Sequence, residues 1–181
     1  MGALILTLLV EATGQGGTKM QPQAWQPLAS TTGHFSILMP GAPVLEHSVE
    51  KSFLGLIHSD IYKVDTDKGE EFSIEFVRVP AVALFFVGGK SILNRSKKGL
   101  LKDESGEAVA LSRVPFGEGM GEELIYKAKG KDGAPLMGMA RFLILKRNLY
   151  ILAVTASPSQ WDKSRAEEFL NSFEILPTDG K

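Results

Sequence analysis

Alternation of apolar and polar side chains is the strongest pattern in this chain, and it is clearest just before Pro80. Phe72, Ile74 and Phe76 alternate with polar residues at positions 73 and 75. A repeat of two residues is the period of a β-strand with one buried face. Proline has no amide hydrogen to donate to a neighbouring strand, so Pro80 would end the segment. The pattern predicts a half-buried strand here.

The same alternation predicts further strands on both sides of this one. They are expected over residues 35–39, 44–50, 54–64, 109–114, 122–129, 136–146 and 149–156. Residues 65–69, the pair Asp132-Gly133 and the pair Arg147-Asn148 have the composition of tight turns. Connections this short favour antiparallel pairing of consecutive strands.

Two segments have helical spacing instead. Over residues 90–102, Ile92, Leu93, Ser96 and Leu100 recur as one face of an amphipathic helix. Near the C-terminus, Ser159 or a neighbour would cap a second helix with a buried face made of Trp161, Ala166, Phe169 and Phe173. Residues 81–87 are interpreted as an apolar connection, and residues 174–176 as a final extended piece.

These elements predict an α+β fold. We expect one antiparallel sheet of about six to eight strands, with two main helices that bury their apolar faces on it. The expected single domain covers residues 25–177, followed by a tail over 178–181.

The N-terminal segment favours export of the protein. Residues 2–10 are mostly apolar, and Val10-Glu11-Ala12 places small residues at alternate positions, as signal-peptidase cleavage requires. Residues 1–24 are therefore expected to be a signal peptide and a flexible leader, and the protein exported or periplasmic. No Lys or Arg precedes the apolar run, which leaves an ordinary apolar tail and a cytoplasmic protein as the alternative. The run is too short to span a bilayer, so we expect no transmembrane span in the mature chain.

Composition narrows the possible chemistry. The 181 residues include 20 basic and 21 acidic side chains and no cysteine. The net charge of −1 gives no overall attraction to nucleic acid, which we do not expect as a partner. The absence of cysteine excludes disulfides, thiolate catalysis and iron–sulfur clusters.

Two glycine-rich segments resemble nucleotide-binding loops but lack their essential parts. Gly89-Lys90-Ser91 has the end of a P-loop, but the first glycine of that motif would fall on Leu84. The segment 117–121 precedes a predicted strand, whereas a dinucleotide loop precedes a helix that helps to bind the pyrophosphate. We therefore expect no cofactor, and a turn is the better interpretation of the second segment.

Metal and catalytic sites are equally incomplete in the sequence. Asp65, Asp67, Glu70 and Glu71 could supply oxygen ligands, but their spacing is not that of an EF-hand, and we expect no metal site. The chain has no Gly-x-Ser-x-Gly motif, and no catalytic residue is assigned. Whether the protein is an enzyme stays open. A hydrolase or transferase site assembled by folding would use His58, Asp60 and the strand that carries Arg141.

One cluster of basic residues marks a candidate binding surface. It lies on the predicted helix 90–102, and together with Arg141 it provides the candidate binding residues, which are Lys90, Arg95, Lys97, Lys98 and Arg141. Clustered cations on one helix face could hold an anionic surface, although a solvated face is the ordinary interpretation. No aromatic residues alternate with them to stack on bases.

Several short segments resemble an uncharacterised family of bacterial exported domains. The opening Phe35-Ser36-Ile37-Leu38-Met39-Pro40-Gly41-Ala42-Pro43 is similar to that family's Phe-x-Val-x-x-Pro-Gly-x-Pro. Later similarities are at residues 98–101, 119–122, 141–143, 147–150 and 169–173, so the resemblance covers nearly the whole domain. The layout is also similar to the PsbP-like α/β/α sandwich. The resemblance implies a fold and an exported setting, and it implies no catalytic or ligand residues.

Together these observations favour a non-enzymatic binding or protein-interaction module of the cell envelope or periplasm. Its partner would be an unidentified protein or small molecule. The alternatives are the fold-assembled hydrolase or transferase, and a binder of anionic surfaces through the basic helix.

Overall fold

The computed structural model describes residues 24–52 and 55–177. The expected export signal, nearly all of the leader and the whole of the expected tail lie outside the described residues.

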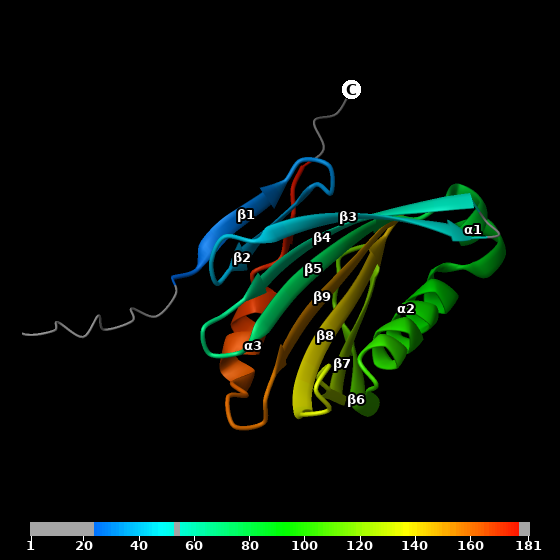
Figure 1. Ribbon diagram of the computed structural model, residues 1–181. Coiled ribbons are helices and arrows are strands. Elements are labelled where there is room, and N and C mark those ends of the chain that lie inside the picture. The colour runs from blue at the N-terminus through cyan, green and yellow to red at the C-terminus, as the bar shows by residue number, and fades with distance from the viewer. Residues whose placement is uncertain (1–23, 53–54, 178–181) are drawn as a thin grey trace, which may run out of the picture.

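A seven-stranded antiparallel sheet forms the centre of the molecule (Figure 1). Its strands, in spatial order, are β3 (Val44–Ser52), β4 (Gly55–Asp65), β5 (Glu71–Arg78), β9 (Asn148–Ala156), β8 (Pro135–Leu145), β7 (Met120–Lys129) and β6 (Glu107–Val114). Each of these corresponds to a strand predicted from alternation. The α+β class and the antiparallel pairing are confirmed.

A second sheet, which the sequence did not reveal, lies over one face of the first. It contains β1 (Gln26–Ser30), β2 (Phe35–Met39) and β10 (Glu174–Ile175) in the order β1-β2-β10. The prediction of a single sheet is therefore wrong in this detail, because Pro40-Gly41 turns the chain between β2 and β3. Gly41 has φ 139°, which a side chain would disfavour. The side chains of Phe35, Ile37 and Met39 are buried.

Three helices complete the fold of the described residues. Helix α2 (Gly89–Asp103) is close to its predicted range. Helix α3 (Lys163–Asn171) is capped by Asp162, whose Oδ1 accepts a hydrogen bond of 3.1 Å from the Arg165 amide, and not by Ser159. Helix α1 (Ala81–Val87) was predicted as a connection, because all seven of its residues are apolar and give no helical period.

The helices lie on opposite faces of the large sheet, so the molecule has a core on each side (Figure 1). The core under α3 and the small sheet includes Phe35, Phe72, Tyr150 and Phe169. The core under α1 and α2 includes Leu93, Tyr126 and Phe142.

One end of the large sheet gathers several loops that are far apart in the sequence. The junction of β5 and α1, the β8–β9 turn and the β1–β2 turn meet there. The Tyr150 hydroxyl fixes the β1–β2 turn by donating a hydrogen bond of 2.9 Å to the Gly33 carbonyl. This end carries the main candidate site.

Candidate functional site

A pocket of about 400 Å³ opens at this end of the sheet, and we call it the end pocket. Its walls come from β4, β5, the residue before α1 and two turns. The lining residues are Thr32, Leu56, His58, Asp60, Phe76, Arg78, Pro80 and Arg147.

Strand geometry places the polar groups of β4 and β5 on one wall. His58 and Asp60 are two residues apart on β4 and therefore point to the same face. Asp60 is opposite Phe76 in the β4–β5 register, and Arg78 is two residues further along β5 on that face. The Arg78 side chain is exposed.

The β8–β9 turn supplies a second guanidinium in a fixed position. Arg147 Nε donates to the Val79 carbonyl at 3.1 Å, and the Val79 amide donates to the Arg147 carbonyl at 2.8 Å. These two bonds attach the turn to the segment between β5 and α1. The two terminal nitrogens of Arg147 form no hydrogen bond with any residue in the described part of the chain.

A histidine already pairs with Asp60, the one acidic side chain among the described residues that line the end pocket. His47 Nδ1 and Asp60 Oδ1 are 2.7 Å apart, across the β3–β4 pair. His47 is exposed, whereas the Asp60 carboxylate is mostly covered. The charge of the end pocket is therefore dominated by Arg78 and Arg147, which favours an anion.

The end pocket contains the two residues that the sequence suggested for a fold-assembled hydrolase or transferase site. His58 and Asp60 share the end pocket, as the sequence suggested, but Asp60 is hydrogen-bonded to His47. The hydroxyl of the pocket lining belongs to Thr32. Within the described ranges, no hydrogen bond joins that hydroxyl to His58 or Asp60.

Arg141 lies away from the end pocket, in the opposite half of the sheet. Its guanidinium donates to Glu123 Oε2 at 2.7 Å, to the Leu170 carbonyl at 2.9 Å and to Asn171 Oδ1 at 3.1 Å. These bonds attach the C-terminal end of α3 to β7 and β8. Arg141 is thus engaged in holding the fold together.

The basic residues predicted on helix 90–102 do not share one environment. Lys90, Arg95 and Lys98 are exposed on α2, whereas Lys97 is buried and forms an ion pair with Glu122 on β7. Lys90 lines a second pocket, of about 300 Å³, beside Arg113, Met120 and Glu122. Of the five predicted binding residues, three lie exposed on this helix and could contact a partner, namely Lys90, Arg95 and Lys98.

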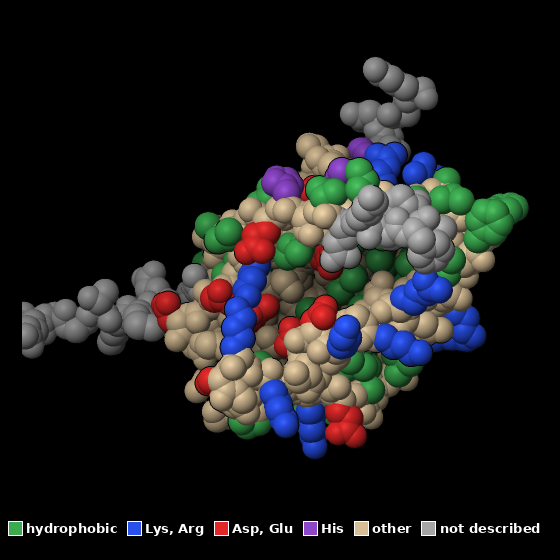
Figure 2. All heavy atoms as spheres, turned by 45° about the vertical axis from the view of Figure 1, so that its right-hand side comes forward, with side chains coloured by type: hydrophobic (Ala, Val, Ile, Leu, Met, Phe, Trp, Pro, Cys, Tyr) green, Lys and Arg blue, Asp and Glu red, His purple; other side chains and the backbone are tan. Residues whose placement is uncertain are grey.

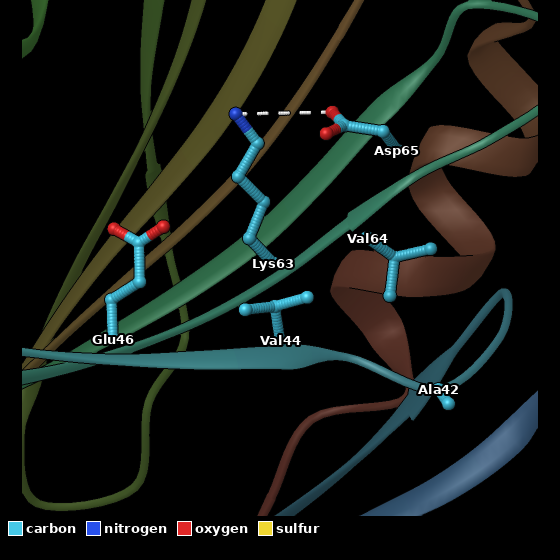
Figure 3. A pocket seen from close by; sticks show the side chains of 6 residues that line it. All are labelled: Ala42, Val44, Glu46, Lys63, Val64 and Asp65. Carbon is cyan, nitrogen blue, oxygen red and sulfur yellow. Dashed lines mark ion pairs between the residues drawn. The ribbon is translucent and has the colours of Figure 1, made fainter.

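A third pocket, of about 340 Å³, lies beside β3 and β4 (Figure 3). The figure shows Lys63 reaching toward Asp65, with Glu46 standing apart. Lys63 Nζ is 2.6 Å from Glu71 Oε2 and 3.8 Å from Asp65 Oδ1. Desolvation opposes the charge of Lys63, but the bond to Glu71 and the nearby acids outweigh it and raise its pKa. Because this cation is already compensated, the pocket is a weaker candidate.

The acidic hairpin between β4 and β5 is occupied by structural contacts. The buried Glu70 carboxylate is 3.1 Å from Arg165 Nε, an ion pair without hydrogen-bond geometry. Across residues 24–52 and 55–177, no three His, Asp or Glu side chains are placed to hold a metal ion together.

Sequence reasoning missed an exposed apolar group on α1 that includes the two most exposed large apolar side chains of the described residues, Phe85 and Phe86. Val82, Phe85 and Phe86 are exposed to 43%, 83% and 73%, and we call this group the α1 tip. It also missed Arg78 and Arg147. The signals available were the period of two along β5, which places Arg78 beside Phe76, and the two adjacent phenylalanines in a short apolar run.

The fold that carries these sites is of the PsbP-like α+β type, as the resemblance implied. A solved structure with this fold is the solution structure of CyanoP, the cyanobacterial PsbP of Synechocystis sp. PCC 6803. It is 16% identical, the match covers 91% of this chain and 99% of that one, and the TM-score is 0.59. This likeness shows the fold.

A more distant structural match is the crystal structure of PA94, a protein of unknown function from Pseudomonas aeruginosa. It is 14% identical, with 85% of this chain and 99% of that chain covered and a TM-score of 0.48. No protein-family model and no curated protein matches the chain. Among the helices described, none combines the length and the apolar character needed to cross a membrane.

Proposed function

We propose that this protein is a non-enzymatic binding module of the cell envelope or periplasm, and that it holds an anionic group in the end pocket. The observation that carries the proposal is the pair Arg78 and Arg147 at a pocket whose one carboxylate is already paired with His47. The ligand class is a carboxylate or a phosphate.

Guanidinium chemistry favours these groups. Its planar set of donors matches the oxygens of a carboxylate or a phosphate, and such charge-assisted bonds contribute about 1.5–3 kcal/mol each. Arg147 is held by its Nε bond to Val79, so little side-chain freedom remains to be lost on binding. A pocket of about 400 Å³ would accommodate a small molecule or a single charged group of a larger one.

Titration with inorganic phosphate and with succinate, followed by amide chemical shifts at low ionic strength, tests the pocket. We expect shifts centred on residues 58, 78 and 147. Arg78→Gln/Arg147→Gln should weaken binding by about tenfold or more, because two charge-assisted contacts are lost.

The matched control is Lys129→Gln/Lys131→Gln, which removes the same charge from exposed positions at the other end of the sheet. It should leave the affinity within about twofold, the size of a screened long-range charge effect. Equal weakening in both variants, or unchanged binding in the arginine variant, would refute the anion pocket.

The envelope or periplasmic location is supported by the N-terminal sequence pattern and by the resemblance to exported domains. N-terminal sequencing of protein from fractionated cells tests it. An intact Met1 in the cytosolic fraction would contradict it.

A further inference from the structure

The α1 tip is an apolar surface that nothing in the described part of the chain covers. Ala83 faces the core and is 6% exposed, whereas the rings of Phe85 and Phe86 project outward. Their centroids are 5.1 Å apart and their ring planes meet at 88°, so the two rings form an edge-to-face pair. Exposed aromatic clusters of this kind usually mark a contact surface.

The sequence around the α1 tip is entirely free of acidic residues. From residue 76 to residue 102 there is no Asp or Glu, but there are six basic side chains. Lys97 is paired with Glu122. The other five form no ion pair with any described residue, and they are Arg78, Lys90, Arg95, Lys98 and Lys102.

Basic side chains flank the apolar projection in space as well. Figure 2 shows apolar side chains projecting at the right edge, with Lys and Arg side chains above and below them. The acidic side chains in this view lie at the left, in the centre and at the bottom, and none is seen at the right edge. The surface thus combines an apolar centre with a cationic border.

The geometry points to an anionic lipid surface as the partner of the α1 tip. Val82, Phe85 and Phe86 enter the interface between headgroups and acyl chains, and Lys90, Arg95 and Lys98 contact lipid phosphates. Arg78 also binds a lipid phosphate. This contact alone rests on the proposed function, in which Arg78 binds an anionic group.

Shape and charge both favour a lipid surface over a protein partner. The tip is a convex projection, and a bilayer accepts such a projection without a preformed groove. Aromatic and aliphatic side chains bordered by cations are the composition of interfacial anchors, in which apolar insertion and attraction to anionic headgroups add. Seven residues are far too few to span a bilayer, so the contact is peripheral.

Vesicle flotation with the full chain tests the inference. We expect binding to phosphatidylcholine vesicles that contain about 30 mol% phosphatidylglycerol, and weak or no binding to pure phosphatidylcholine. Raising the salt concentration should weaken binding, because the electrostatic part is screened.

Two pairs of variants separate insertion from charge. Phe85→Ser/Phe86→Ser should lose about tenfold or more in vesicle affinity, whereas Val109→Ser/Leu111→Ser, which removes exposed apolar groups from β6, should lose less than about twofold. Lys90→Gln/Arg95→Gln/Lys98→Gln should lose about tenfold or more, and Lys127→Gln/Lys129→Gln/Lys131→Gln much less. The thermal midpoint of Phe85→Ser/Phe86→Ser should match that of the parent, because both rings are exposed.

The outcomes that overturn the inference are distinct from those that overturn the anion pocket. No vesicle binding at low salt, equal binding to both vesicle types, or full binding by Phe85→Ser/Phe86→Ser would refute lipid docking. Self-association that this variant abolishes, without vesicle binding, would assign the α1 tip to a second copy and also refute it. Loss of phosphate binding in Arg78→Gln/Arg147→Gln would support the end pocket. Unchanged phosphate binding would refute that pocket and, with it, only the Arg78 contact of the lipid inference.

Discussion

Single residues show how closely neighbouring strands of the large sheet pack against each other. Gly138 lies on β8 beneath the ring of Tyr126, and a side chain there would overlap the ring. Tyr126 is fully buried, and burial is also the main cause that raises the pKa of its hydroxyl. Glycine inside a strand usually weakens the strand. Here Gly138 makes room for Tyr126, the largest side chain of the core under α1 and α2.

Gly138→Ala should therefore destabilise the protein by about 2–3 kcal/mol, because the Tyr126 ring must move in a packed core. Gly99→Ala is the matched control. Gly99 lies within α2 with nothing near its would-be methyl group, so this change should stabilise by about 0.5–1 kcal/mol. Urea unfolding of both variants measures the two effects, and a neutral Gly138→Ala would show that the ring does not rest on this glycine.

At the scale of elements, local repeats explain what could be predicted and what could not. The period of two in β5 and the helical spacing in α2 are set by one buried face each, so both were visible in the sequence. Helix α1 is apolar on all sides, and its conformation follows from its place between Pro80 and Gly88, which has φ 76°. β1 lies inside the predicted domain but was not predicted as a strand, because its composition has no clear alternation and its conformation depends on pairing with β2.

In the candidate site, too, local spacing predicted some residues, and long-range contacts determine the position of the others. His58 and Asp60 could be placed on one face of a strand from their spacing alone. The proximity of Arg78 and Arg147 could not be predicted from the sequence. It depends on the hydrogen bond between Arg147 and Val79, which are 68 residues apart in the chain. Long-range contacts of this kind carry no local period.

The contact between α2 and β7 shows why a basic helix is not always a basic surface. The side chains of Lys97 and Glu122 are only 8% and 15% exposed, and they form an ion pair between the helix and the sheet. Removal of one partner leaves a buried charge without compensation.

Lys97→Met should therefore cost about 3–5 kcal/mol in the free energy of unfolding, and Lys97→Met/Glu122→Met should cost less than this single change. Lys98→Met, the exposed neighbour, should change stability by less than about 0.5 kcal/mol. Chemical unfolding of these proteins, together with Glu122→Met to complete the double-mutant cycle, gives the coupling. If the double variant were the least stable, the pair would not be compensating charge.

Over the whole molecule, a net charge of −1 hides a separation of charge. Residues 76–102 carry cations without acids, whereas Glu71, Asp65 and Glu104 surround Lys63 near the other end of the sheet. Burial raises the pKa of Glu104, and repulsion from Glu71 and Asp103 adds to this, partly offset by Lys63. Folding therefore disfavours the ionised form of this carboxyl group.

The sign of the resulting pH dependence follows from proton binding. Between the ordinary glutamate pKa and the raised value, the folded state binds more protons than the unfolded state, so the free energy of unfolding falls as pH rises. Glu104→Gln removes this loss. We expect Glu104→Gln to raise the thermal midpoint at pH 7 by at most about 2–4 °C, which corresponds to at most about 1 kcal/mol in the free energy of unfolding. The effect at pH 4 should be smaller.

Glu107→Gln, at an exposed position on β6, is the matched control and should give the same small difference at both pH values. Thermal unfolding at the two pH values measures the contrast. The carbonyl of Glu104 accepts a hydrogen bond from the Lys129 amide, which glutamine keeps, so the substitution changes the charge and leaves the junction of α2 and β7 intact. A Glu104→Gln effect that is equal at pH 4 and pH 7 would mean that the acids near Lys63 do not act on the stability of the fold through this group.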